Sequence, residues 1–119
     1  MAEGACFCGA VRVATRAEPL RVGLCHCLDC RKHGGAPFAA AVIFAEGDVT
    51  ISGETRRFRD RYFCPTCGST THSTSPGEVE IALGLFPPDS FRPSYELWTC
   101  RREGWLPEIP GLVRHTRNR

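Results

Sequence analysis

The stretch Cys64-Pro65-Thr66-Cys67-Gly68 is the segment around which the fold of this chain can be organised. Two residues between the cysteines let a tight turn aim both sulfurs at one metal ion, and the glycine tolerates the unusual backbone angle that follows. This spacing is typical of a zinc knuckle. It supplies two of the four ligands that a tetrahedral structural zinc requires, so a second pair must come from elsewhere in the sequence.

A second pair of cysteines occurs near the start of the sequence, in Cys6-Phe7-Cys8. Alternate residues of a strand share one face, so Cys6 and Cys8 can hold one ion while Phe7 points away. Burial of both as small hydrophobic side chains is the alternative. Combined with the knuckle, this pair predicts a closed zinc site of four thiolates.

A third cluster is Cys25-His26-Cys27-Leu28-Asp29-Cys30. Its three sulfurs can face one ion and leave a fourth coordination position for an exchangeable ligand, the arrangement of catalytic zinc. Two alternatives stay open: His26 completes the shell, or Cys27 and Cys30 join the knuckle in a zinc ribbon. Strand alternation turns His26 away from its neighbouring cysteines, and the ribbon leaves three cysteines without a role.

The interpretation that we favour has two zinc ions per chain. They are assigned to Cys6, Cys8, Cys64 and Cys67 (structural zinc) and to Cys25, Cys27 and Cys30 (second zinc). The lone Cys100 is not expected to be a ligand, because no partner lies at metal-binding spacing.

Eight cysteines in 119 residues indicate disulfides, metal or redox chemistry. The N-terminal residues show no export signal, and the longest apolar run, 38–45, is too short to span a bilayer. We therefore expect a cytoplasmic protein, in which reducing thiol pools favour metal over disulfides. The net charge of +2 comes without a basic stripe, so we expect no nucleic-acid or membrane partner.

Short β-rich runs between Gly, Pro and Asp breaks predict a mainly β chain with one domain over residues 1–110 and a basic, frayed tail over 111–119. The expected strands are 11–15, 20–24, 37–44, 49–52, 61–63, 79–83 and 95–98. One helical turn is expected at 28–33, ended by a left-handed cap at Gly34-Gly35. Its Arg31, Lys32 and His33 either face solvent or orient an anion beside the second zinc.

Three segments, in this order and spacing, carry a family signature. They are Gly4-Ala5-Cys6-Phe7-Cys8-Gly9-Ala10-Val11-Arg12, Cys25-His26-Cys27-Leu28-Asp29-Cys30-Arg31-Lys32 and Phe63-Cys64-Pro65-Thr66-Cys67-Gly68-Ser69. From about Gly4 to Trp105 the chain resembles the glutathione-dependent formaldehyde-activating family, which also includes centromere protein V. The resemblance implies a β-tent fold of small antiparallel sheets with a short helical turn, organised around the two zinc sites assigned above.

The resemblance also implies the joining of glutathione and formaldehyde to S-hydroxymethylglutathione, formally a carbon-sulfur lyase reaction in reverse. We therefore expect a zinc-dependent carbon-sulfur lyase, or thiol-adduct synthase, that acts on glutathione or a related thiol and an aldehyde such as formaldehyde. Its catalytic residues would be Cys25, Cys27 and Cys30, as ligands of the open zinc site. The competing hypothesis is a non-catalytic zinc module that binds a protein partner or carries a thiol.

Overall fold

The computed structural model describes residues 1–119 and consists mainly of strands, with one short α-helix. The elements are β1 (Glu3–Ala5), β2 (Arg12–Thr15), β3 (Arg21–Cys25), α1 (Leu28–Gly34), β4 (Ala39–Ala45), β5 (Val49–Ser52), β6 (Arg56–Phe58), β7 (Arg61–Phe63), β8 (Thr70–Ser75), β9 (Glu78–Ala82), β10 (Tyr95–Leu97) and β11 (Val113–Arg114). This confirms the prediction of a mainly β chain with one helical turn. None of its helices has the length and apolarity needed to cross a lipid bilayer.

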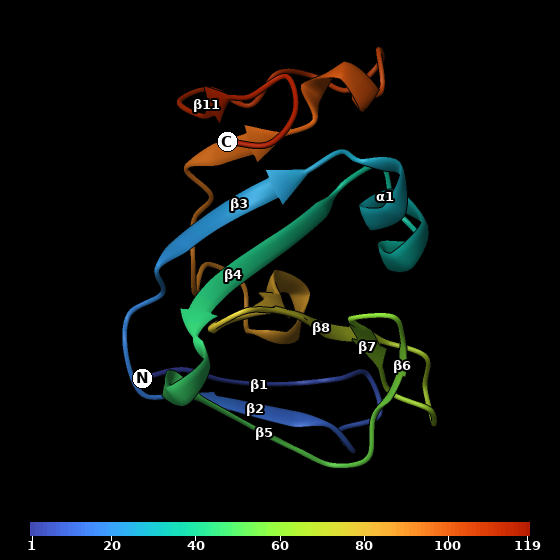
Figure 1. Cartoon of the computed structure of the whole chain (residues 1–119), viewed down its shortest axis with the longest axis vertical. Helices are drawn as coiled ribbons and strands as arrows, with labels where there is room; N and C mark the ends of the chain where they lie inside the picture. Colours follow the sequence, from blue (N-terminus) through green and yellow to red (C-terminus); the bar gives the residue numbers. More distant parts are fainter.

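The strands form two sheets. A small antiparallel sheet has the order β1-β2-β5, and a larger sheet has the order β11-β10-β3-β4-β9-β8-β7-β6. Strands β3 and β4 run diagonally through the molecule, between the small sheet and the C-terminal segment (Figure 1). Strand β10 pairs in parallel with both β3 and β11, whereas the other pairs are antiparallel. The sequence did not indicate these parallel pairs.

The main hydrophobic core lies where the small sheet packs against β3, β4 and β9. Its buried members are Val13, Val22, Val42, Phe44, Val79, Ile81 and Phe86. Phe44 is fully buried, which contributes about 2–3 kcal/mol relative to an exposed ring. A second small cluster contains Cys6, Val11 and Cys64 and connects the two sheets at the knuckle.

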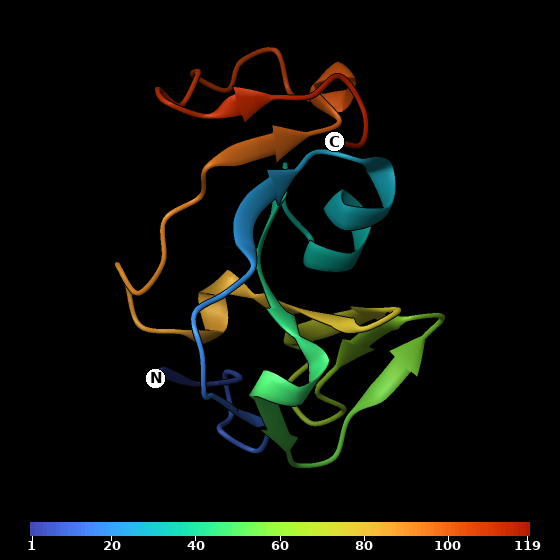
Figure 2. The same cartoon turned by 60° about the vertical axis from the view of Figure 1, so that its left-hand side comes forward.

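Helix α1 follows β3 directly and lies between the C-terminal segment and the β7–β8 hairpin (Figure 2). It begins at Cys27, whose sulfur accepts a hydrogen bond from the Cys30 backbone N–H at 3.3 Å. It ends at Gly35, which adopts the left-handed conformation with φ of 61°. The predicted helical turn and its glycine cap are therefore confirmed.

All seven expected strands are present, within two residues of their predicted ends. The structure adds β1, β6, β8 and β11, of which β8 is the longest. The residues that we expected to form a frayed tail are instead hydrogen-bonded. His115 N–H donates to the Glu96 carbonyl at 2.9 Å, and Trp98 N–H donates to the Arg117 carbonyl at 3.1 Å. The tail therefore covers one side of β10.

Candidate metal centres

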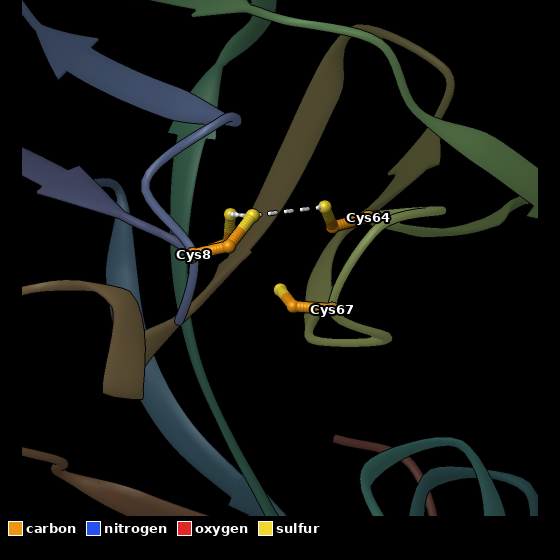
Figure 3. Close-up of side chains that lie close together, drawn as sticks. Cys8, Cys64 and Cys67 are labelled. Carbon is orange, nitrogen blue, oxygen red and sulfur yellow. Dashed lines mark hydrogen bonds between the residues drawn. The ribbon is translucent and has the colours of Figure 1, made fainter.

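The four cysteines of the first predicted site converge, as Figure 3 shows for Cys8, Cys64 and Cys67. The sulfurs of Cys6, Cys8, Cys64 and Cys67 all lie within 4.8 Å of one another. The Cys6–Cys8 and the Cys8–Cys64 sulfur pairs are each 3.7 Å apart. Zinc–sulfur bonds of about 2.3 Å in a tetrahedron place sulfurs about 3.8 Å apart. The four side chains therefore fit a tetrahedral zinc ion.

Both cysteine pairs of this cluster lie on turns. The Gly9 N–H donates to the Cys6 carbonyl at 3.0 Å, and the Gly68 N–H donates to the Cys64 carbonyl at 2.8 Å. The knuckle geometry is as expected, but the strand geometry predicted for Cys6 and Cys8 was wrong, because β1 ends at Ala5. The turn achieves the same separation of side chains, since Phe7 points away and is 93% exposed.

Ser69 connects the two turns and acts on the knuckle thiol. Its hydroxyl lies 3.2 Å from the Cys67 sulfur and accepts a hydrogen bond from the Phe7 backbone N–H at 3.1 Å. The hydrogen bonds from the Ser69 hydroxyl and backbone lower the pKa of the Cys67 thiol to about 5. A thiolate is the form that binds metal, so this environment favours a metal ligand.

The second predicted site is assembled from one continuous segment. Cys25 ends β3, Cys27 caps α1 and Cys30 lies in the helix; the three sulfurs lie within 4.8 Å of one another and are half-buried. These cysteines form a group separate from the knuckle cysteines, which is not the arrangement of a zinc ribbon. The His26 side chain faces away from the cluster and contacts Glu96 instead, as strand alternation predicts.

Arg61 lies beside this three-cysteine cluster. Its Nη1 donates to the Cys30 sulfur at 3.6 Å from the start of β7. Contact with the Cys25 thiol and, secondly, the Arg61 guanidinium lower the pKa of the Cys30 thiol to about 6, against the effect of burial. Sequence reasoning missed Arg61. The only signal was the density of arginines between Arg56 and Arg61, which carries no information about a contact with residue 30.

A cavity of about 600 Å³ opens next to Arg61, between α1 and the β6–β7 hairpin. It is lined by Asp29, Lys32, His33, Phe58, Arg59, Asp60, Arg61, Phe63, Gly68 and Thr70. Of the three basic residues predicted near the site, Lys32 and His33 line this cavity. Arg31 does not, because its guanidinium donates to Glu103 at 2.6 Å. Lys32, Arg59 and Arg61 outnumber the two aspartates, so the cavity suits an anionic group.

A smaller hollow of about 330 Å³ is lined by Cys27, Leu28, Asp29, Trp98 and Arg101. Asp29 belongs to both hollows. Cys100 is exposed and belongs to neither cysteine cluster. The smaller hollow thus opens on Cys27 of the three-cysteine cluster, and the larger cavity lies against Arg61, which contacts Cys30.

Three comparisons place this chain among known proteins. Residues 1–101 match the model of the family described as glutathione-dependent formaldehyde-activating enzyme. A protein of Schizosaccharomyces pombe named as an uncharacterized lyase is 29% identical over 75 residues, which cover 59% of this chain and 55% of that protein. A crystal structure of a Rhodobacter sphaeroides protein matches with a TM-score of 0.57 at 24% identity, covering 95% of this chain and 98% of that one. This last likeness concerns the fold alone.

Proposed function

Because this chain belongs to the glutathione-dependent formaldehyde-activating enzyme family, we propose that it is a zinc-dependent carbon-sulfur lyase, or thiol-adduct synthase. Its substrates are glutathione or a related thiol and an aldehyde such as formaldehyde. In the forward direction a bond forms between the thiol sulfur and the aldehyde carbon, and the carbonyl π pair moves to oxygen. The thiol proton ends on that oxygen, giving a hydroxymethyl thioether, and the lyase direction reverses these steps.

The observation that carries the proposal is the difference between the two clusters. Cys6, Cys8, Cys64 and Cys67 offer four sulfurs, which is a complete structural shell, and Cys25, Cys27 and Cys30 offer three. A zinc ion held by Cys25, Cys27 and Cys30 would supply positive charge that favours the ionised form of a bound thiol. We assign the first set to structural zinc and the second to the reaction.

The residues around the three-cysteine cluster orient the thiol. Glutathione carries two carboxylates, and the cavity beside Arg61 presents Lys32 and Arg59 to such groups. Arg61 is partly buried, so its interaction with an anion is less screened than that of a fully exposed side chain. With its carboxylates held in this cavity, the thiol is directed toward Cys30, which Arg61 contacts.

The hollow at Cys27 gives the second reactant its own approach. It reaches the cluster from the side of Trp98 and Arg101, and its volume of about 330 Å³ leaves ample room for a small aldehyde. Holding the aldehyde and the thiol at one cluster turns a bimolecular encounter into a positioned reaction, which raises the rate without a new chemical group. Arg101 adds positive charge where the aldehyde oxygen becomes anionic.

The test is exchange spectroscopy on an equilibrium mixture of formaldehyde and glutathione, which reads the forward and reverse rates together. The zinc-loaded protein should accelerate exchange, and Cys27→Ser should abolish both the acceleration and thiol binding measured by calorimetry. Cys100→Ser is the matched control, because it makes the same atom change at an exposed cysteine outside both clusters. If the intact protein leaves exchange at background for every common cellular thiol, the proposal fails and a non-catalytic zinc module takes its place.

A further inference from the structure

Between two of the proposed ligands, Cys25 and Cys27, lies a histidine that is completely buried. The Nε2 atom of His26 is 2.9 Å from the Oε1 atom of Glu96, a carboxylate that is 2% exposed. An ionised carboxylate only accepts hydrogen bonds, so the imidazole Nε2–H is the donor. The other ring nitrogen of His26 has no hydrogen-bond partner among the protein atoms. Glu96 is therefore the single polar contact of this side chain.

The backbone of His26 is held by β10, the strand that carries Glu96. Its N–H donates to the Leu97 carbonyl at 3.0 Å, next to the pairing of Cys25 with Leu97 between β3 and β10. The Phe38 ring packs against the imidazole with the ring centroids 5.4 Å apart. Residue 26 is thus fixed through its backbone, its hydrogen bond and its ring face. Because consecutive extended residues point to opposite sides, fixing His26 inward turns Cys25 and Cys27 outward.

The charge of Glu96 is compensated by the segment that follows it. Arg114 Nε lies 3.4 Å from one carboxylate oxygen, and Arg102 Nε lies 3.8 Å from the other. An ionised carboxylate with 2% exposure is costly unless it is paired and hydrogen-bonded. His26, Arg102 and Arg114 surround the Glu96 carboxylate. These contacts connect β10 and the C-terminal residues to the segment 25–27.

From this geometry we infer that Glu96 and His26 are positioning residues for the three-cysteine cluster. The Glu96 carboxylate holds the imidazole, and the imidazole fixes the direction in which the thiols of Cys25 and Cys27 project. Neither residue is a metal ligand. The inference rests on the proposed function only in taking this cluster as a metal site, and it adds that metal affinity there depends on a carboxylate 70 residues away in sequence.

Cobalt titration of the metal-free protein tests the inference without any activity measurement, because cobalt–thiolate absorption reports the number and arrangement of the sulfur ligands. Groups that orient metal ligands typically contribute about 10–100-fold to metal affinity. Glu96→Ala should therefore lower the cobalt affinity of the three-cysteine cluster by about that factor and leave the affinity of the four-cysteine cluster unchanged. Glu96→Gln keeps the shape and one acceptor oxygen for the imidazole, so it should retain most of the affinity. Glu78→Ala is the control, because it removes the ion pair with Arg21 at the far end of β3.

A second variant separates positioning from stability. The double variant His26→Phe, Glu96→Leu removes both members of the hydrogen bond, so neither is left buried without the other. It also takes the counter-charge from Arg102 and Arg114, so its folding is checked by circular dichroism before the titration. It keeps an aromatic ring against Phe38 and removes the hydrogen bond. We expect its four-cysteine cluster to bind cobalt normally and its three-cysteine cluster to bind about 10–100-fold more weakly, with an altered spectrum.

Wild-type affinity at the second site in this folded double variant would overturn the inference and leave the proposed function intact. A wild-type protein that binds only one cobalt ion would instead refute the proposed metal role of the cluster. Equal weakening of both clusters in Glu96→Ala would mean that Glu96 stabilises the whole fold rather than this site.

Discussion

Arg61 Nη1 on β7 donates a hydrogen bond to the Cys30 sulfur on α1 at 3.6 Å, which brings a cation from the β6–β7 hairpin to the three-cysteine cluster. The guanidinium lies at the boundary between the cluster and the 600 Å³ cavity. It is therefore placed to offset negative charge on three thiolates and to attract an anionic substrate at the same time. Because Arg61 borders both the cluster and the cavity, it is the first residue to substitute.

Arg61→Ala should weaken glutathione binding to the zinc-loaded protein roughly tenfold, because a hydrogen bond from a charged donor is worth about 1.5 kcal/mol. Arg61→Lys should give an intermediate affinity, since it restores the charge without the planar guanidinium geometry. Calorimetric titration measures both variants, with metal content checked beforehand. Unchanged affinity in Arg61→Ala would show that this arginine does not contact the substrate.

The two metal ions should differ in lability. Cys8 and Cys64 join segments 56 residues apart, so loss of metal from the four-cysteine cluster should unfold the domain. Cys25, Cys27 and Cys30 come from one short segment, and their metal should leave first under mild chelation while the fold remains. Metal analysis together with circular dichroism follows both events. Loss of both ions in one step together with the fold is the contrary result.

Cys100→Ser should leave the metal content at its wild-type value. The Cys100 side chain is exposed and belongs to neither cluster, so it has no sulfur neighbour to complete a site. Elemental analysis of the purified variant is sufficient. A lower zinc content than in the wild-type protein would reassign the ligands of the three-cysteine cluster.

Acid should destabilise the protein partly through His72. Burial lowers the pKa of His72 to about 4, where its ring stacks on Tyr62 with the centroids 4.2 Å apart. The unfolded value is about 6.5, so between these pH values the unfolded chain binds more protons and unfolding becomes more favourable as pH falls. The loss of stability on going from pH 7 to pH 5 should include about 2 kcal/mol from this residue.

The matched variant for this effect is His72→Phe, which keeps a ring against Tyr62 and removes the titrating group. Both proteins lose thiolate-bound metal in acid alike, so the difference between their denaturant midpoints at pH 7 and pH 5 isolates His72. Parallel pH dependence in the two proteins would mean that His72 stays neutral in the unfolded chain or charges without cost in the folded one.

Local patterns accounted for the features that depend on neighbouring residues. The helical turn ends at Gly35 as predicted because a left-handed cap needs only the glycine itself. The grouping of the cysteines followed from spacing in the same way. Strand β8 was missed because Thr70–Ser75 contains no apolar alternation; Thr71 and His72 are buried there by their neighbours rather than by their own hydrophobicity.

The contacts that set the chemistry of the site were beyond local patterns. Arg61 reaches Cys30 across 31 residues, and Glu96 reaches His26 across 70. Neither pair has a periodic or spaced signature, because each depends on how β7 and β10 pack against the segment from Cys25 to Cys30. The sequence indicated that His26 points away from the cysteines but gave no information about what it contacts.

The last prediction concerns which thiols the protein accepts. If the cavity beside Arg61 holds the carboxylates of the substrate, removing the exposed cations Arg59 and Lys32 should weaken the binding of acidic thiols selectively. Arg59 has a positive φ of 55°, so Arg59→Asn removes the charge with a residue that tolerates this backbone conformation. Lys32→Gln removes the second of these two charges, which lies on α1. Exposed charges contribute about 0.2–1 kcal/mol each, so the double variant should bind glutathione at least about twofold and at most about thirtyfold more weakly.

A neutral thiol such as 2-mercaptoethanol should bind the double variant and the wild-type protein equally. Added salt should weaken glutathione binding to the wild-type protein and have less effect on the double variant, because screening acts on the charges that were removed. Arg92→Gln is the control, since Arg92 is an exposed arginine that lines neither hollow. Equal weakening of the acidic and the neutral thiol would place the substrate carboxylates elsewhere, whereas a selective loss in the Arg92 variant would show that only net charge matters.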